Sequence, residues 1–211
     1  MKGQRCSGEE HDFQREKWDE GTRHSSIIAS EYNGTLNLKL KRTPGIYLIG
    51  FMGSGKTTIG TALADRIGWR FVDLDDEIER EQGRSIVEIF DQDGEEVFRQ
   101  MEYEALKERV RRVQMGHPMV LALGGGAFTQ PSVIDMLDHN GVTIWIDTDF
   151  PIVKKRIANS PHRPLARDAI RFQALFYARR DLYERAHYRV EVHEDNSAAA
   201  LEAILKLPLF D

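Results

Sequence analysis

Hydrophobic positions from Gly45 onward alternate between two patterns. Short apolar runs typical of buried strands are separated by longer stretches whose apolar residues recur at helical spacing. The predicted strands are Ile46–Ile49, Arg70–Asp73, Met119–Leu123, Val142–Asp147 and Tyr188–Val192. The predicted helices are Lys56–Ile67, Glu95–Val113, Pro131–His139, Pro151–Asn159, Ala169–Arg185 and Ala198–Lys206. This β–α alternation predicts an α/β fold, in which helices cover both faces of a five-stranded parallel sheet.

The first 43 residues show no sustained hydrophobic period and mix charges with Gly, Ser and His. We expect residues 1–43 to form a polar, poorly ordered N-terminal extension and residues 44–211 to form the folded domain. The leucines of Leu36–Leu40 alternate with polar residues, a pattern also compatible with a short edge strand. The turn chemistry of Thr43-Pro44-Gly45 separates the extension from the domain.

Composition narrows the class of protein. The net charge of -5 argues against a general nucleic-acid binder. The single cysteine, Cys6, cannot form an internal disulfide, which fits a reducing compartment. No apolar run approaches the roughly 20 residues of a membrane-spanning helix, and the N-terminus lacks the apolar core of a secretory signal. We therefore expect a soluble cytoplasmic monomer with no membrane or nucleic-acid partner.

The segment Gly50–Thr57 has the sequence Gly-Phe-Met-Gly-Ser-Gly-Lys-Thr and matches the phosphate-loop pattern G-x-x-x-x-G-K-[ST]. Its glycines let backbone N–H groups point at phosphate oxygens, and the following helix adds its positive dipole end. The pattern assigns Lys56 to the β/γ-phosphates and Thr57 to Mg²⁺. A chance glycine-rich turn is the alternative, but the strand–loop–helix context favours nucleotide binding. The candidate ATP-binding residues here are Gly53, Ser54, Gly55, Lys56, Thr57 and Thr58.

Ligands of parallel α/β sheets bind outside the carboxyl ends of the strands, so the residues that follow each strand are candidates for chemistry. Asp73 and Asp75 follow the second strand, and residues two apart on an extended chain project to the same side. One carboxylate near Mg²⁺ and one facing an acceptor hydroxyl would suit phosphoryl transfer. Helix capping is the alternative role, and we assign it to Asp76.

Three glycines, Gly124-Gly125-Gly126, follow the third strand. Such a run lets a ligand approach the backbone closely, although a flexible turn is the alternative. The residues Ser160–Asp168 form a basic loop with two prolines, which suits either a water-excluding lid or an ordinary surface loop. The cysteine and the histidines show no metal-ligand spacing.

The long predicted helix contains Phe98-Arg99-Gln100-Met101-Glu102, in which Arg99 is a candidate anion ligand. Other side chains in this part of the chain have structural interpretations. We expect Gln92-Asp93-Gly94 to be a turn and Trp69 and Trp145 to belong to the core. We expect a solvated surface position for each of Arg109, Arg111 and Arg112.

Together these motifs resemble the shikimate kinase family, P-loop kinases of the nucleoside-monophosphate-kinase-like fold. The resemblance extends from Gly45 to the C-terminus. It implies a three-layer αβα domain with a lid and substrate-binding helices. The motifs that carry it are Gly50–Thr57, Asp73-Leu74-Asp75, Phe98–Glu102, Gly124–Gly126, and Arg163-Pro164-Leu165 with Arg179-Arg180-Asp181-Leu182-Tyr183.

The resemblance implies transfer of the ATP γ-phosphoryl group to the 3-hydroxyl of shikimate, on the route to chorismate and aromatic amino acids. It assigns Mg²⁺ to Thr57 and, through water, to Asp73. Asp75 would bind the shikimate hydroxyls and act as the base. The remaining implied roles are carboxylate binding by Arg99 and Arg179, orientation of Arg99 by Glu102, substrate contact by Gly124, Gly125 and Gly126, closure of Arg163 onto the phosphates, and adenine contact by Arg156.

Two departures from the family pattern affect these assignments. Asp181 stands where the family usually has Pro, so the register of Arg179 against Arg180 rests on the four-residue spacing from Arg179 to Tyr183. The lid segment is also short for the family.

Two other functions remain open: a related small-metabolite kinase such as gluconate kinase, or a non-catalytic nucleotide-binding regulator. The Phe-Arg-x-x-Glu motif together with the triple glycine favours shikimate as the acceptor. A regulator would be expected to have a damaged site, whereas Lys56, Thr57, Asp73, Asp75 and Arg163 are all present.

Overall fold

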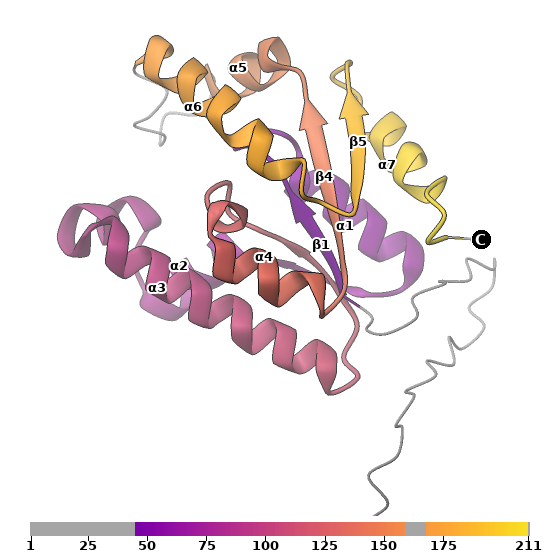
Figure 1. Ribbon diagram of the computed structural model, residues 1–211, viewed down its shortest axis with the longest axis horizontal. Coiled ribbons are helices and arrows are strands. Elements are labelled where there is room, and N and C mark those ends of the chain that lie inside the picture. The colour runs from indigo at the N-terminus through magenta and orange to yellow at the C-terminus, as the bar shows by residue number, and fades with distance from the viewer. Residues whose placement is uncertain (1–44, 159–167, 211) are drawn as a thin grey trace, which may run out of the picture.

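The computed structural model describes residues 45–158 and 168–210. Its five strands form one sheet in the order β2-β3-β1-β4-β5, and every pair is parallel (Figure 1). The strands are β1 Gly45–Ile49, β2 Arg70–Asp73, β3 Met119–Ala122, β4 Val142–Thr148 and β5 Tyr188–Val192. The predicted five-stranded parallel sheet is confirmed. The predicted extension, its possible edge strand and the predicted lid lie outside the described residues, apart from Asp168.

Within the described residues, six helices and one 3₁₀ turn connect the strands, and a seventh helix follows β5. They are α1 Lys56–Ile67, α2 Leu74–Gln82, α3 Ile86–Gln114, η1 Ala127–Thr129, α4 Pro131–Asp138, α5 Phe150–Ala158, α6 Ala169–Tyr183 and α7 Ser197–Leu205. No helix in these two ranges is long and apolar enough to cross a membrane.

Alternate residues of the central strands face opposite sides of the sheet and build two apolar cores. Ile46 and Leu48 of β1 pack with α1 and α7, whereas Tyr47 and Ile49 pack with the helices of the other face, which include α3, α4 and α6 (Figure 1). Trp145 is buried and Trp69 is half-buried against the core, as predicted. The sheet is therefore the central layer of three, which fixes the strand ends that carry the site.

The helix α3 is longer than predicted and begins at Ile86. Ser85 and Glu88 form a reciprocal capping box at its start. The predicted turn at residues 92–94 is wrong for its first two residues, which are helical. Only Gly94 leaves the helical conformation, with φ 85° and ψ 170°, and it marks a kink between two helical parts. The glycine is needed there because other side chains rarely adopt this φ.

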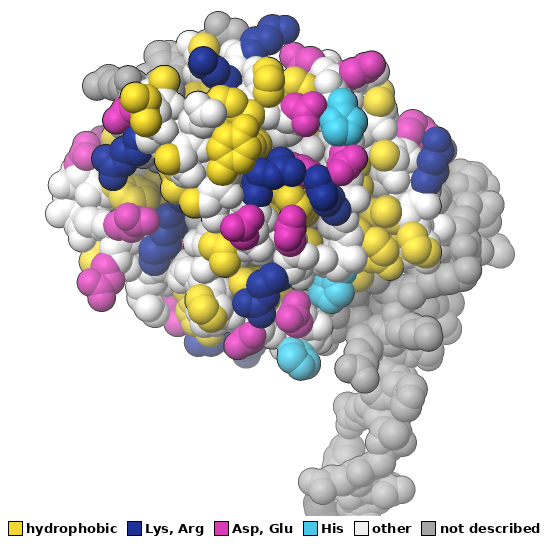
Figure 2. Space-filling view, turned by 45° about the horizontal axis from the view of Figure 1, so that its top comes forward, with side chains coloured by type: hydrophobic (Ala, Val, Ile, Leu, Met, Phe, Trp, Pro, Cys, Tyr) yellow, Lys and Arg dark blue, Asp and Glu magenta, His cyan; other side chains and the backbone are white. Residues whose placement is uncertain are grey.

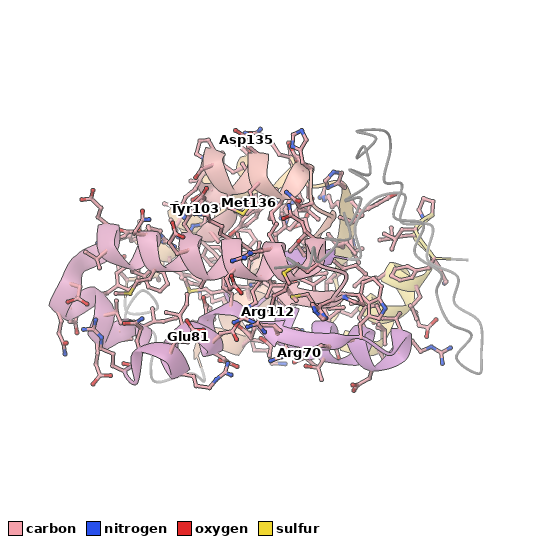
Figure 3. The ribbon with its side chains drawn as sticks, turned by 90° about the horizontal axis from the view of Figure 1, so that it is seen from below. Arg70, Glu81, Tyr103, Arg112, Asp135 and Met136 are labelled. Atoms are coloured by element: carbon pink, nitrogen blue, oxygen red, sulfur yellow. The ribbon has the colours of Figure 1, made fainter. Side chains whose placement is uncertain are left out.

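The prediction of a solvated surface position is wrong for Arg109 and correct for Arg111 and Arg112, whose side chains are exposed. The Arg109 side chain is buried between α3 and α2, where its Nε lies 2.5 Å from Glu77 Oε2. Figure 3 shows α2 beside α3 and labels Glu81 of α2, whose Oε1 lies 3.6 Å from Nη2 of Arg109. A buried charge needs a partner, and Glu77, which is also buried, supplies it.

Replacing Arg109 by Met is expected to lower the free energy of unfolding by about 3 kcal/mol, because the Glu77 carboxylate would lose its main buried partner. The double change Arg109→Met with Glu77→Gln should recover part of this loss. Urea denaturation of the two variants measures both effects. Arg111→Met, on the exposed side of the same helix, is the matched control and should change the stability by less than about 0.5 kcal/mol. An Arg109→Met variant as stable as that control would show that the buried pair contributes nothing.

The molecular surface mixes charges of both signs. Figure 2 shows Lys and Arg side chains interspersed with Asp and Glu on the face that it draws.

Packing between α3 and α4 leaves Tyr103 and Met136 partly buried against the core, and Figure 3 shows both residues where these helices face each other.

Candidate active site

The carboxyl ends of β1, β2 and β3 lie side by side and bring three of the predicted motifs together. Strand β3 pairs with both of its neighbours in register, so that Asp73 at the end of β2 is opposite Ala122. The phosphate loop follows β1, and the triple glycine follows β3 after Leu123. Parallel α/β sheets bind their ligands at this edge.

The phosphate loop wraps the start of α1. Gly55 occupies the N-cap position with φ 99°, and it has no side chain to cap the helix. The first N–H groups of α1 therefore keep their capacity to bind an anion. Lys56 Nζ donates to the carbonyl oxygens of Gly50 and Phe51 at 2.9 and 3.0 Å. The lysine side chain thus folds back over the loop. It is expected to bind the phosphates of a nucleotide held by that loop.

Thr57 and Asp73 are in direct contact. The hydroxyl of Thr57 donates to Asp73 Oδ2 at 2.7 Å, and the other oxygen of Asp73 accepts from the backbone N–H of Asp75 at 3.1 Å. Asp73 is therefore the N-cap of α2, and the assignment of the capping role to Asp76 is wrong. The reasoning from an extended chain also fails for Asp75, which lies in the first turn of α2.

The triple glycine packs against the charged side chains of the site. A Cβ atom added to Gly124 would lie 2.6 Å from both Asp75 Oδ1 and Glu102 Oε1, and one added to Gly126 would collide with the guanidinium of Arg99. Side chains at these two positions would therefore force the charged groups of Asp75, Glu102 and Arg99 to move. The approach of a ligand to the backbone of the three glycines, which the sequence suggested, stays a prediction.

Arg99 and Glu102 form an ion pair on α3. Arg99 Nη1 lies 2.7 Å from Glu102 Oε2, and Gln130 donates to the same oxygen at 3.2 Å. Glu102 is only 1% exposed. Burial raises its pKa, although Arg99 and Arg179 oppose this shift. The carboxylate holds the Arg99 guanidinium in one orientation at the rim of the site.

The two consecutive arginines of α6 have different surroundings. Arg179 lies over the ring of Phe51, with its Cζ 5.6 Å from the ring centroid, and beside Gly125. Arg180 instead forms an ion pair with Asp147. Tyr183, one helical turn after Arg179, donates its hydroxyl to the carbonyl oxygen of Gly125 at 2.5 Å. The structure thus brings Arg179, and not Arg180, to the triple glycine.

Arg156 lies at the outer edge of the phosphate loop. Its Nη1 donates to the carbonyl oxygen of Gly53 at 3.0 Å, and its Nη2 donates to Asp195 Oδ1 at 2.8 Å. Arg163 lies outside the described residues, so the structure does not place it.

Sequence reasoning missed four residues that support the site: Gln130, Asp147, Tyr183 as a hydrogen-bond donor, and Asp195. Asp147 stands near the carboxyl end of β4, so the strand-end rule that selected Asp73 could also have selected it. Gln130 and Asp195 carry no motif. Only the folded chain shows their contacts with Glu102 and Arg156.

Comparisons with known proteins agree with this geometry. A family model described as shikimate kinase matches residues 52–207. A shikimate kinase of Macrococcus caseolyticus (strain JCSC5402) is 40% identical over 153 residues, which cover 71% of this chain and 86% of that protein. A shikimate kinase of Synechococcus sp. (strain CC9605) is 40% identical over 173 residues, covering 79% of this chain and 84% of that protein.

Similarity extends to solved structures. The shikimate kinase from Acinetobacter baumannii in complex with shikimate has 37% sequence identity and a TM-score of 0.72, and the match covers 78% of this chain and 92% of that one. The range of the family model contains every candidate site residue from Gly53 to Arg179.

Proposed function

Because this chain belongs to the shikimate kinase family, we propose that it transfers the γ-phosphoryl group of ATP to the 3-hydroxyl of shikimate, giving shikimate 3-phosphate and ADP. One observation carries this proposal beyond the family. Arg99, Glu102, Arg179 and Asp75 surround the triple glycine at the same sheet edge as the phosphate loop. The groups that we assign to the phosphate donor and to the acceptor therefore adjoin each other.

The acceptor side suits a ring with one carboxylate and several hydroxyls. Arg99 and Arg179 offer planar guanidinium groups that can bind a carboxylate through paired hydrogen bonds. Glu102, which accepts a hydrogen bond from Gln130, pairs with Arg99, so the arginine loses little side-chain freedom on binding. Asp75 lies against Gly124 and supplies the carboxylate for a hydroxyl.

The donor side suits a nucleoside triphosphate. We assign the phosphates to the backbone of the phosphate loop and to Lys56, whose amine would exchange the loop carbonyls for phosphate oxygens. Arg156, already in contact with the loop at Gly53, is assigned to the adenine. Arg163 is proposed to close onto the phosphates.

The residues Thr57 and Asp73 fit a magnesium ion. A hydroxyl and a carboxylate oxygen 2.7 Å apart are the ligand types that Mg²⁺ takes from proteins, with water and phosphate oxygens in its other positions. When bound, the ion would neutralise charge on the phosphate oxygens.

In the proposed reaction the 3-hydroxyl oxygen attacks the γ-phosphorus as the bond from that phosphorus to the β–γ bridging oxygen breaks. Asp75 accepts the hydroxyl proton, and ADP leaves with the bridging oxygen. Arg99 and Arg179 orient the ring so that the hydroxyl faces the phosphate, and Lys56 meets the charge on the transferred group. Positioning and electrostatics supply most of the rate in such transfers.

A coupled assay of ADP release with shikimate, with gluconate and without an acceptor tests this function. Of these three reactions, we expect ADP release only in the one that contains shikimate. Turnover with gluconate but not shikimate would overturn the proposal in favour of the related kinase. The absence of turnover with every acceptor would favour the non-catalytic regulator.

Replacing Arg99 by Ala is expected to raise the KM for shikimate by roughly 10- to 100-fold, since a charge-assisted hydrogen bond contributes about 1.5–3 kcal/mol. The KM for ATP should change little, because Arg99 lies on the acceptor side. Steady-state kinetics measures both constants. Arg111→Ala, at an exposed position of the same helix, is the matched control. An unchanged shikimate KM in the Arg99 variant would contradict the carboxylate assignment.

A further inference from the structure

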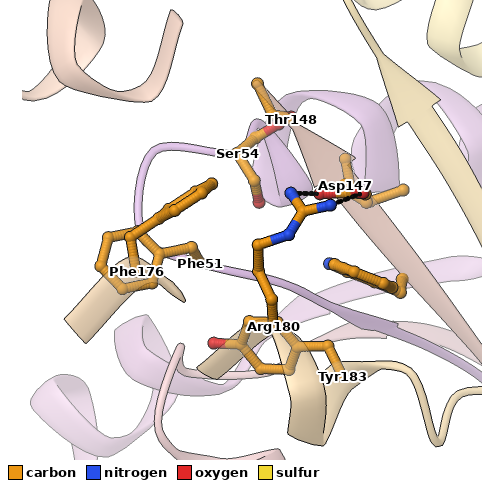
Figure 4. A pocket seen from close by; sticks show the side chains of 9 residues that line it. Phe51, Ser54, Asp147, Thr148, Phe176, Arg180 and Tyr183 are labelled. Carbon is orange, nitrogen blue, oxygen red and sulfur yellow. Dashed lines mark hydrogen bonds and ion pairs between the residues drawn. The ribbon is translucent and has the colours of Figure 1, made fainter. Parts of the chain in front are cut away.

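Helix α6 carries two consecutive arginines, and only Arg179 has a role in the proposed reaction. Consecutive residues on an α-helix point about 100° apart around its axis, because 3.6 residues make one turn. The direction of Arg180 therefore determines the direction of Arg179. Figure 4 shows Arg180 reaching from α6 to Asp147 near the end of β4, with both ends of its guanidinium paired to the carboxylate.

The Asp147 carboxylate is buried and doubly paired. It is 5% exposed, and its Oδ2 lies 2.7 Å from Nη2 of Arg180. Arg189 of β5 is a second partner, with Nη2 also 2.7 Å from Oδ2. Trp145 lies beneath both guanidinium groups, whose Cζ atoms are 5.2 and 4.9 Å from ring centroids of that residue. A two-point arginine–carboxylate contact of this kind fixes orientation as well as distance.

Helix α6 also contacts the phosphate loop, mostly through aromatic side chains. Phe172 and Phe176 meet the ring of Phe51 edge-on, with centroids 5.3 and 5.2 Å apart. Such apolar contacts hold the helix against the sheet, but hydrophobic burial has little directional preference. The polar contacts at the C-terminal part of α6, Arg180 to Asp147 and Tyr183 to Gly125, are the ones that define its rotation.

The enclosed space beside Arg180 is too small to hold a substrate. The cavity that Arg180 shares with Phe51, Ser54 and Thr148 measures about 10 Å³, which is enough for about one water molecule (Figure 4). The contacts of Arg180 are with Asp147, Trp145 and Phe176, all of them parts of the protein. Arg180 therefore acts by holding α6 in place against Asp147.

We propose that the Arg180–Asp147 pair is a positioning clamp, which sets the rotation of α6 so that Arg179 presents its guanidinium to the acceptor carboxylate. This inference rests on the proposed function, which assigns Arg179 to that carboxylate. Arg180 is a positioning residue and acts on the substrate only through Arg179.

The test compares Arg180→Met with Arg189→Met. Both changes remove one arginine from Asp147 and leave the other in place, so the carboxylate stays paired and the domain stays folded, but only the first releases α6. We expect Arg180→Met to raise the KM for shikimate about 10-fold, because small misplacements of a binding group are costly. The KM for ATP should stay within about twofold in both variants, and Arg189→Met should leave the shikimate KM within about twofold.

Combining each change with Arg179→Ala tests the route of the effect. If Arg180 acts through Arg179, Arg180→Met should have almost no further effect on the shikimate KM in the Arg179→Ala background. An additive 10-fold loss there would overturn the clamp, since Arg180 would then act independently. Equal losses in Arg180→Met and Arg189→Met, or no loss in either, would also overturn it.

Hydrogen exchange of the α6 amides gives a measure that needs no substrate. Amide exchange in α6 should be faster in Arg180→Met than in Arg189→Met. This expectation does not depend on which acceptor the enzyme phosphorylates. A wild-type protein without shikimate turnover would refute the proposed function, whereas equal exchange in the two variants would refute the clamp. The two failures are therefore distinguishable.

Discussion

Asp75→Asn is expected to lower kcat by about 10²- to 10⁴-fold, the usual contribution of a positioned general base. The change keeps the size of the side chain beside Gly124 but removes its capacity to take a proton. Steady-state kinetics at saturating ATP and shikimate measures this loss.

The neighbouring carboxylate provides the control. Asp76 is exposed in the same first turn of α2, so Asp76→Asn removes an equal charge without touching the site. Asp76→Asn should leave kcat almost unchanged. If Asp75→Asn lowers kcat by less than about tenfold, Asp75 orients the hydroxyl and does not abstract its proton.

Lys56→Met is expected to lower kcat by about 10²- to 10³-fold, the typical cost of removing one preorganised donor from a developing anion. Methionine keeps the length and apolar stem of the side chain but loses the ammonium group. In the structure that group donates to two carbonyl oxygens of the loop, and its proposed role is to meet the charge on the transferred phosphoryl group. Pre-steady-state or steady-state turnover at saturating ATP measures the loss.

Two controls separate catalysis from folding in this experiment. A thermal melt should show that Lys56→Met is folded. Lys206→Met, which removes an equal charge from the exposed end of α7, should leave turnover unchanged. Wild-type turnover in a folded Lys56→Met protein would refute the assigned role.

The strands were predictable because the central ones are continuous apolar runs. Both faces of β1 and β3 are buried under helices, so nearly every residue is apolar and no other element fits so short a run. The helix α2 was harder to predict. It is short and acidic, and only Leu74, Glu77 and Ile78 are buried, which leaves little hydrophobic pattern to detect.

Arg109 illustrates what a local pattern cannot contain. It stands among charged residues on α3, and the sequence alone gives it the same surroundings as Arg111 and Arg112. Its burial depends on the position of Glu77, 32 residues earlier in the chain. Only the packing of α2 against α3 brings the two charges together.

The residues of the site were mostly selected from motifs, but their geometry was not. The spacing from Arg179 to Tyr183 favoured Arg179 without giving the rotation of α6, which depends on contacts with Asp147 and Gly125. The triple glycine was expected to admit a ligand. Its first and third members are surrounded by protein side chains, a constraint that no local pattern expresses.

Asp73 has consequences for how inactive relatives of this chain should be recognised. Its carboxylate caps α2 through the N–H of Asp75 and also accepts the hydroxyl of Thr57, so it contributes to the stability of the helix whether or not any reaction occurs. Loss of an N-cap costs about 0.5–2 kcal/mol. A descendant that had abandoned phosphoryl transfer would therefore still be selected to keep a capping residue at this position. Retention of Asp73 is therefore weak evidence that such a descendant is an enzyme, whereas retention of Arg99 or Arg179 would be stronger evidence.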